Sequence, residues 1–193
     1  MGAGRIITGF SKPYVAKYAA SGGTVTYTDG QILSQGVSVT GSASTSDNND
    51  FYADNVISET EAGVFTSGEL SLTVKGLEIE AERLIMGLPA ADTNGLTAYG
   101  DNQVIPEVGV GFVVRYMKDG VTTYAPYIFP RCLFAAFDVA AATQEESIDW
   151  QTTELSATIK RAEDANRNWK YVGDGVATEA AAEDVIKTFF GIQ

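Results

Sequence analysis

The chain has 193 residues and a formal charge of −12, from 25 acidic and 13 basic side chains, with one cysteine and no histidine. The absence of imidazole excludes Ser-His-Asp and Cys-His nucleophile pairs, histidine-bound zinc and histidine general bases. One cysteine cannot close an internal disulfide. The 45% hydrophobic content is that of an ordinary globular protein, and we expect one domain with arms.

The acidic residues are concentrated in one part of the chain. Residues 21–111 carry 13 acids and only two bases, Lys75 and Arg83. A basic stripe that would grip nucleic-acid phosphates is therefore missing. The first ten residues lack the long apolar stretch of a signal peptide, and no run approaches the roughly 18 to 20 apolar residues of a membrane span. We expect a protein that is made in a cytoplasm and binds no membrane.

Alternating hydrophobic and polar residues predict strands with one buried face in the first half of the chain. Residues 36–40 place Val37 and Val39 on one side, and residues 68–74 do the same for Leu70, Leu72 and Val74. Between them, residues 42–66 are rich in Ser, Asn and Asp and hold five acids but no base. That composition predicts a long solvated loop.

The hydrophobic period becomes helical over residues 77–87. Leu77, Ala81, Leu84 and Leu88 recur at helical spacing, and acids crowd the first turn, where the helix dipole favours them. Gly87, followed closely by a proline, ends the pattern. We expect one short helix lying against the sheets.

Residues 108–134 predict a long β-hairpin. Asp119-Gly120 supplies the positive-φ residues of a tight turn, and four side chains share the buried face: Val110, Phe112, Val114 and Tyr116. Gly109 and Gly111 lack the third glycine of a dinucleotide-binding loop and precede a strand, so they predict a close approach of another segment to the backbone. Cys132 is expected to be a small buried thiol.

The last third of the chain predicts core strands and a separate arm. Alternation places Ile148 with Trp150, and Leu155 with Ala157 and Ile159, on buried faces. Residues 174–193 follow a Gly-Asp-Gly break and form a C-terminal arm beyond the domain of residues 1–173. The hydrophobic side chains of the arm need a surface to bury them, in the same subunit or in a neighbour: Val185, Ile186, Phe189 and Phe190.

The sequence gives little support for a catalytic or metal-binding site. The run at 47–55 fails the calcium-loop pattern, because Asp47, Asn49 and Phe51 do not alternate oxygen ligands and no glycine occupies the sixth position. Glu145 and Glu146 could serve as a glycosidase pair, but among 25 acids such pairing is expected by chance. We expect no catalytic residue, metal or cofactor.

Two hypotheses about surface residues remain open. Aromatic residues could form a sugar-binding platform on a sheet, although at strand spacing they are more often core and interface anchors: Tyr52, Tyr99, Tyr116, Tyr124, Tyr127, Trp150, Trp169 and Tyr171. The basic residues Lys160, Arg161, Arg167 and Lys170 enclose two acids and predict a solvated or inter-subunit face.

The order of four segments resembles the major tail protein family of long, non-contractile-tailed bacteriophages, the siphophages, over most of residues 44–172. These segments are FYADN (51–55), ELSLTVKGLEIEAERLIMG (69–87), VGVGFVVRYMKDGVTTYAPYIFPRCLF (108–134) and TQEESIDWQTTELSATI (143–159). The alanine-rich stretch at 135–143 departs from the family, and the arm at 174–193 lies outside the shared pattern.

The resemblance implies a mainly β protein, a β-sandwich of two antiparallel sheets with one flanking helix, an inter-subunit loop and terminal arms. It implies a structural virion protein without catalytic activity, which polymerises as stacked hexameric rings into the tail tube through which DNA is ejected. Its implied partners are further copies of itself, a tape measure protein inside the tube, and tail tip and terminator proteins, with double-stranded DNA passing without specific binding. Assembly would take place in the bacterial host cytoplasm.

The same reading assigns assembly roles to particular residues. We expect the loop at 42–66 to stay mobile in the monomer and to order against a neighbour, with Phe51 and Tyr52 as buried anchors. Asp47, Asp50 and Asp54 would seek basic partners such as Arg161 or Arg167 of a neighbour. Phe189 and Phe190 of the arm are further expected inter-subunit contacts. If acids of residues 21–111 line the channel, DNA meets like charge and slides. The alternatives are another tube or tail-completion component and a carbohydrate-binding adhesin.

Overall fold

The computed structural model describes residues 4–139 and 150–192. No helix in these two stretches is both long and apolar enough to cross a membrane. The elements are, in chain order, β1 (Ile6–Ser21), β2 (Thr24–Ile32), β3 (Gly36–Thr45), β4 (Asn49–Ala53), β5 (Val56–Glu61), β6 (Phe65–Val74), α1 (Ile79–Met86), β7 (Glu107–Lys118), β8 (Val121–Phe134), β9 (Thr153–Ile159), β10 (Tyr171–Val172) and α2 (Glu179–Phe190).

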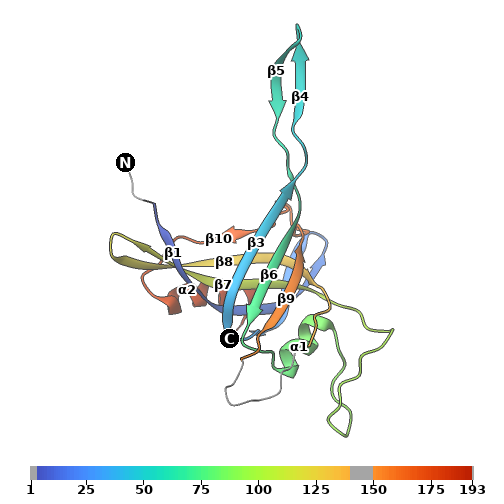
Figure 1. Ribbon diagram of the computed structural model, residues 1–193. Helices are drawn as coiled ribbons and strands as arrows, with labels where there is room; N and C mark the ends of the chain where they lie inside the picture. The colour runs from blue at the N-terminus through green and yellow to red at the C-terminus, as the bar shows by residue number, and fades with distance from the viewer. Residues whose placement is uncertain (1–3, 140–149, 193) are drawn as a thin grey trace.

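A single antiparallel sheet folds over on itself to make the body of the molecule. Its strand order is β2-β1-β7-β8-β9-β6-β3, with β10 also paired to β8. In Figure 1 the strands β1, β7, β8 and β10 form one layer, and β3, β6 and β9 cross it as the second. Strand β8 joins the layers because its last residues, Cys132–Phe134, pair with β9. The expected mainly β sandwich is confirmed, and its two layers belong to one continuous sheet.

The main core lies between the two layers and contains the side chains that alternation predicted. Leu70, Leu72 and Val74 of β6 face the β7 side chains across it, and α1 covers one end. The predicted inward residues of β7 and β9 are all nearly fully buried: Val110, Phe112, Val114, Tyr116, Leu155, Ala157 and Ile159. These predictions are confirmed.

The two strongest local predictions, the hairpin and the helix, are also confirmed. Asp119 and Gly120 join β7 to β8 with φ of 49° and 78°, the positive values that a tight hairpin turn requires. Helix α1 ends at Gly87, whose φ is 65°. A Cβ on Gly87 would lie 2.0 Å from the carbonyl oxygen of Val104, so both the conformation and the contact require glycine.

The C-terminal arm folds as helix α2, which the sequence reading did not predict. The hydroxyl of Thr178 accepts a hydrogen bond from the backbone N–H of Ala181 and caps the helix. The buried side chains of α2 pack on the outer face of the first layer and form a second core with Tyr14, Ala16, Val113 and Ile128. The arm therefore packs on its own subunit, which resolves the alternative left open by the sequence.

Three further expectations need correction or fall outside the described residues. The predicted loop at 42–66 is the end of β3, the hairpin of β4 and β5, and the start of β6. Val37 is exposed because the register of β3 shifts between Gly36 and Ser38. Trp150 is 79% exposed because it precedes β9 and does not share its alternation. Ile148, Glu145 and Glu146 lie outside the described residues.

Candidate self-assembly surfaces

Strands β4 and β5 form a two-stranded hairpin that projects far from the sandwich (Figure 1). We call residues 46–64 the finger. The two strands pair only with each other, and every residue of both is exposed. Asp54 and Asn55 close the tip with φ of 52° and 63°, the values of a type I′ turn. At the base, the backbone N–H of Ser46 donates to the carbonyl of Val64 at 2.8 Å.

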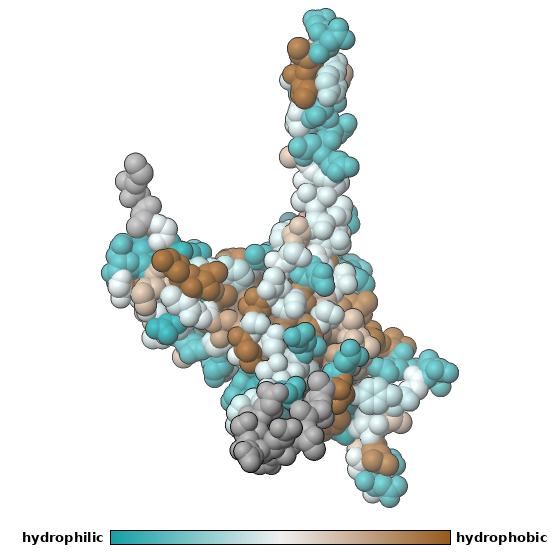
Figure 2. Space-filling model, viewed as in Figure 1, coloured by the Kyte–Doolittle hydropathy of each residue, from teal (hydrophilic) through white to brown (hydrophobic). Residues whose placement is uncertain are grey.

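The finger exposes large hydrophobic side chains that no other described residue covers. Phe51, Tyr52, Val56 and Ile57 are between 54% and 63% exposed. Tyr52 lies opposite Ile57 across the two strands. Figure 2 shows hydrophobic atoms gathered near the end of the finger. Because an isolated two-stranded hairpin is marginally stable in water, such a finger is the kind of element that a partner surface stabilises.

The finger is also acidic. None of its five carboxylates takes part in the ion pairs formed among the described residues. Asp50 accepts a hydrogen bond of 2.6 Å from the hydroxyl of Thr60 on the facing strand, whereas the other charges are exposed to solvent. The structure thus brings the five predicted finger residues onto one projecting element: Asp47, Asp50, Phe51, Tyr52 and Asp54.

The two predicted basic partners have different surroundings. The guanidinium of Arg161 donates to the carbonyl oxygen of Phe65 and lies 5.8 Å from the centroid of its ring. That ring stacks on Trp169 at 4.5 Å. Arg161 is thus engaged within its own subunit, whereas Arg167 is exposed in a turn where its N–H donates to the carbonyl of Asp164 at 3.2 Å.

The two phenylalanines of the arm are used within the subunit. Phe190 is only 2% exposed, and its ring lies 4.9 Å from that of Tyr27. Phe189 is partly buried, with ring centroids 5.4 Å from Tyr27 and 5.2 Å from Tyr171. The expected role of Phe190 as an inter-subunit anchor is wrong for this structure, because its surface is already covered by its own chain.

One outer face of the sandwich carries small hydroxyl side chains and carboxylates but no basic residue. We call it the hydroxyl face. Its cross-strand rows run over β3, β6 and β9, for example Thr40, Ser71 and Ser156. The rows on either side add further members: Ser38, Ser42, Glu69, Thr73, Glu154 and Thr158. The sequence reading noticed the acidic block but missed this face, although the period-two pattern of each strand could have revealed it.

Strand β3 ends the sheet with an unprotected edge. It pairs with β6 on one side only, and its sequence, GVSVTGSAST, contains no charged residue and no proline. Natural proteins usually blunt an exposed edge with lysine, proline or an inward charge, because unpaired N–H and C=O groups invite another strand. The absence of these devices makes β3 a surface that can pair with a strand of a second chain.

A charged cluster at the junction of β7, β8 and β9 serves the fold. Glu107 binds the guanidinium of Arg131 at 2.6 Å and the ammonium of Lys160 at 2.9 Å. Burial raises the pKa of Glu107. The hydrogen bonds from Arg131 and Lys160, together with their positive charges, lower it by more, so that the net shift of the pKa is downward. Burial alone raises the pKa of the neighbouring Cys132 thiol, which is confirmed as a fully buried side chain.

The described residues show neither a cluster of metal ligands nor a shared aromatic platform. No three His, Cys, Asp or Glu side chains in residues 4–139 and 150–192 gather as metal ligands. The aromatic residues do not share an open face, since Tyr116 is buried, Trp169 stacks on Phe65, and Tyr52 lies on the finger. Neither a scan against protein-family models nor a search of curated proteins finds a match for this chain.

Proposed function

We propose that this protein is a structural subunit that polymerises into a hollow tube of stacked rings, as the resemblance to siphophage tail tube proteins implies. The observation that carries the proposal is the finger: a projecting hairpin with five exposed large hydrophobic side chains, which no other described residue buries. Exposed apolar surface of this kind marks a protein-protein contact.

The free edge of β3 supplies a second contact. A strand edge that pairs with a different edge of the next copy makes a head-to-tail interface, which closes into a ring when the rotation allows. Closure removes the exposed edge and with it the risk of aggregation. In this proposal lateral pairing builds rings of six, and the fingers connect one ring to the next.

The hydroxyl face is suited to line the channel. Its serine and threonine hydroxyls are short, and its only charged members, Glu69 and Glu154, are exposed acids. Double-stranded DNA would meet like charge there, and at physiological salt that repulsion extends only about 8 Å from the wall. A wall of this kind lets DNA pass without holding it. Tape measure, tail tip and terminator proteins would be the further partners.

Electron microscopy of the concentrated protein tests the proposal. We expect tubes with a regular ring repeat, built from the unmodified chain in negative stain. The matched control replaces residues 47–62 by a two-residue Asn-Gly turn, because the hydrogen bond between Ser46 and Val64 already brings the two cut ends together. This variant should fold as a stable subunit and form no tubes.

Two results would overturn the proposal. One is a monodisperse single subunit at every concentration, even with a tail initiation complex added. The other is normal tube formation by the variant that lacks the finger, provided that its thermal unfolding matches that of the unmodified chain.

A further inference from the structure

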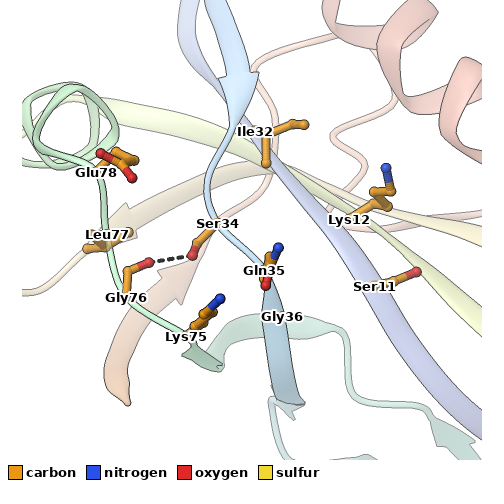
Figure 3. A pocket seen from close by; sticks show the side chains of 10 residues that line it. All are labelled: Ser11, Lys12, Ile32, Ser34, Gln35, Gly36, Lys75, Gly76, Leu77 and Glu78. Carbon is orange, nitrogen blue, oxygen red and sulfur yellow. Dashed lines mark hydrogen bonds between the residues drawn. The ribbon is translucent and has the colours of Figure 1, made fainter. Parts of the chain in front are cut away.

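A cleft of about 690 Å³ opens at the opposite end of β3 and β6 from the finger. Two connections border it: the segment that leads from β2 into β3, and the segment that leads from β6 into α1 (Figure 3). The finger leaves the sandwich where β3 ends and β6 begins, whereas the cleft lies where β3 begins and β6 ends. One pair of strands therefore carries a projection at one end and a hollow at the other.

Backbone contacts hold the walls of the cleft in place. The hydroxyl of Ser34 donates to the carbonyl of Gly76, and the N–H of Lys75 donates to the carbonyl of Gln35 at 2.9 Å. Gly36 at the rim has no room for a side chain, because a Cβ there would lie 2.1 Å from Cε1 of Phe10. The backbone on the two sides of the cleft is thus held in place by the fold.

The cleft carries positive charge in a region of the molecule that is otherwise acidic. Lys12 and Lys75 border it from different elements (Figure 3). Lys75 forms no ion pair among the described residues, and Lys12 lies 3.6 Å from Glu183, with its side chain 44% exposed. Glu78 is the one acid in the lining. Apolar surface is also available, since Ile32 is 48% exposed at the rim.

We infer that this cleft receives the finger of a second copy of the chain. The finger offers carboxylates without ion-pair partners and exposed hydrophobic side chains. The cleft offers the ammonium of Lys75, which forms no ion pair among the described residues, beside apolar lining, and the ammonium of Lys12, which Glu183 neighbours, adds to it. The two surfaces are therefore complementary in charge and in polarity. Because they lie at opposite ends of the same strands, one finger-in-cleft contact leaves a free finger and a free cleft. Such a heterologous contact propagates. This inference rests on the proposed function and assigns the acceptor site to Lys12 and Lys75 in place of the expected Arg161 or Arg167.

Charge reversal in the cleft tests the inference. Lys75→Glu should raise the protein concentration needed for tube formation at least tenfold, and rings that form should fail to stack. The matched control is Lys118→Glu, which makes the same charge change at an exposed position at the end of β7 and should assemble normally. Sedimentation velocity and negative-stain microscopy measure both variants, and thermal unfolding checks that each is folded.

Mixing two blocked chains gives a sharper result. The variant that lacks the finger keeps an intact cleft, and the Lys75→Glu chain keeps an intact finger. Mixed at a concentration too low for ring formation, they should form one-to-one dimers that grow no further, whereas each alone stays a single subunit at that concentration, and salt should weaken the dimer. Normal stacking by Lys75→Glu, or absence of the mixed dimer, would overturn the inference while tubes of the unmodified chain still supported the proposed function. An unmodified chain that never associates would overturn both.

Discussion

The ring of Phe190 fills the space above Gly109, where an added Cβ would lie 2.4 Å from its Cε1 atom. The side chain of Ile186 fills the corresponding space above Gly111, where an added Cβ would lie 2.6 Å from Cγ2 of Ile186. The two glycines alternate along β7 with large residues that point into the main core. Strand β7 is therefore buried on both faces, and its glycines allow α2 to pack close to the backbone.

Filling this contact should destabilise the protein. Gly109→Ala forces α2 or the sheet to shift, and overpacking of this kind costs about 1–3 kcal/mol. For a chain of this size that corresponds to a melting temperature lowered by roughly 2–4 °C per kcal/mol. Gly100→Ala is the control, because no atom lies within 4 Å of a Cβ at Gly100. Equal melting temperatures for the two variants would contradict the packing of α2 described above.

Glu183 should make the attachment of α2 sensitive to acid. The hydrogen bond from the Tyr14 hydroxyl lowers the pKa of Glu183, and Lys187 at 2.9 Å and Lys12 lower it further, against burial, which raises it. A carboxyl whose pKa is lowered by folding stabilises the protein fully above its ordinary pKa of 4.5 and loses that contribution as the pH falls through the lower, folded-state value.

Glu183→Gln should therefore lower the free energy of unfolding by about 1–3 kcal/mol at pH 7, and the difference from the unmodified chain should shrink as the pH falls below 4.5. Denaturant unfolding at a series of pH values measures both effects. Glu61→Gln on the finger removes a charge that forms no ion pair among the described residues and is the comparison. A difference that stays constant down to pH 3 would argue against this role of Glu183.

Cys132 should report on global unfolding. It is the only cysteine, it is fully buried, and burial raises the pKa of its thiol, so the reactive thiolate is disfavoured and shielded. A thiol reagent should modify less than a tenth of the native protein in the time in which the denatured protein reacts completely. Rapid modification of the native protein would contradict the buried position.

The hydroxyl face should control the passage of DNA if it lines the channel. Glu69→Lys combined with Glu154→Lys should slow genome ejection from particles that carry the variant, most strongly at low salt, because the new ammonium groups attract phosphates. Ala19→Lys, on an exposed position of β1, is the control on another strand. Ejection rates at two salt concentrations measure the effect, and unchanged rates for the double variant would remove the hydroxyl face from the channel.

The sequence alone determined those features whose causes are local. Period-two alternation placed Leu70, Leu72 and Val74 in the core, and Asp119-Gly120 placed the turn of the long hairpin. Gly87 ended the helix where predicted. In each case the signal lies within a few residues of the feature, since turn conformation and the face of a strand are set by neighbouring side chains. The finger was missed even though Asp54-Asn55, flanked by Phe51, Tyr52, Val56 and Ile57, is a hairpin signal of the same kind, because the polar composition around it was given more weight.

Only the tertiary structure decided which distant segments meet. Gly109 predicted a close approach, but its partner Phe190 is 81 residues away in the sequence, and nothing local selects that partner over a surface on another subunit. The same holds for the cleft, whose walls come from β1, from the segment before β3 and from the segment after β6. It also holds for the hydroxyl face, whose rows depend on strand register. These contacts are set by long-range packing and by the loss of chain entropy that such packing must offset, and no short stretch of sequence contains them.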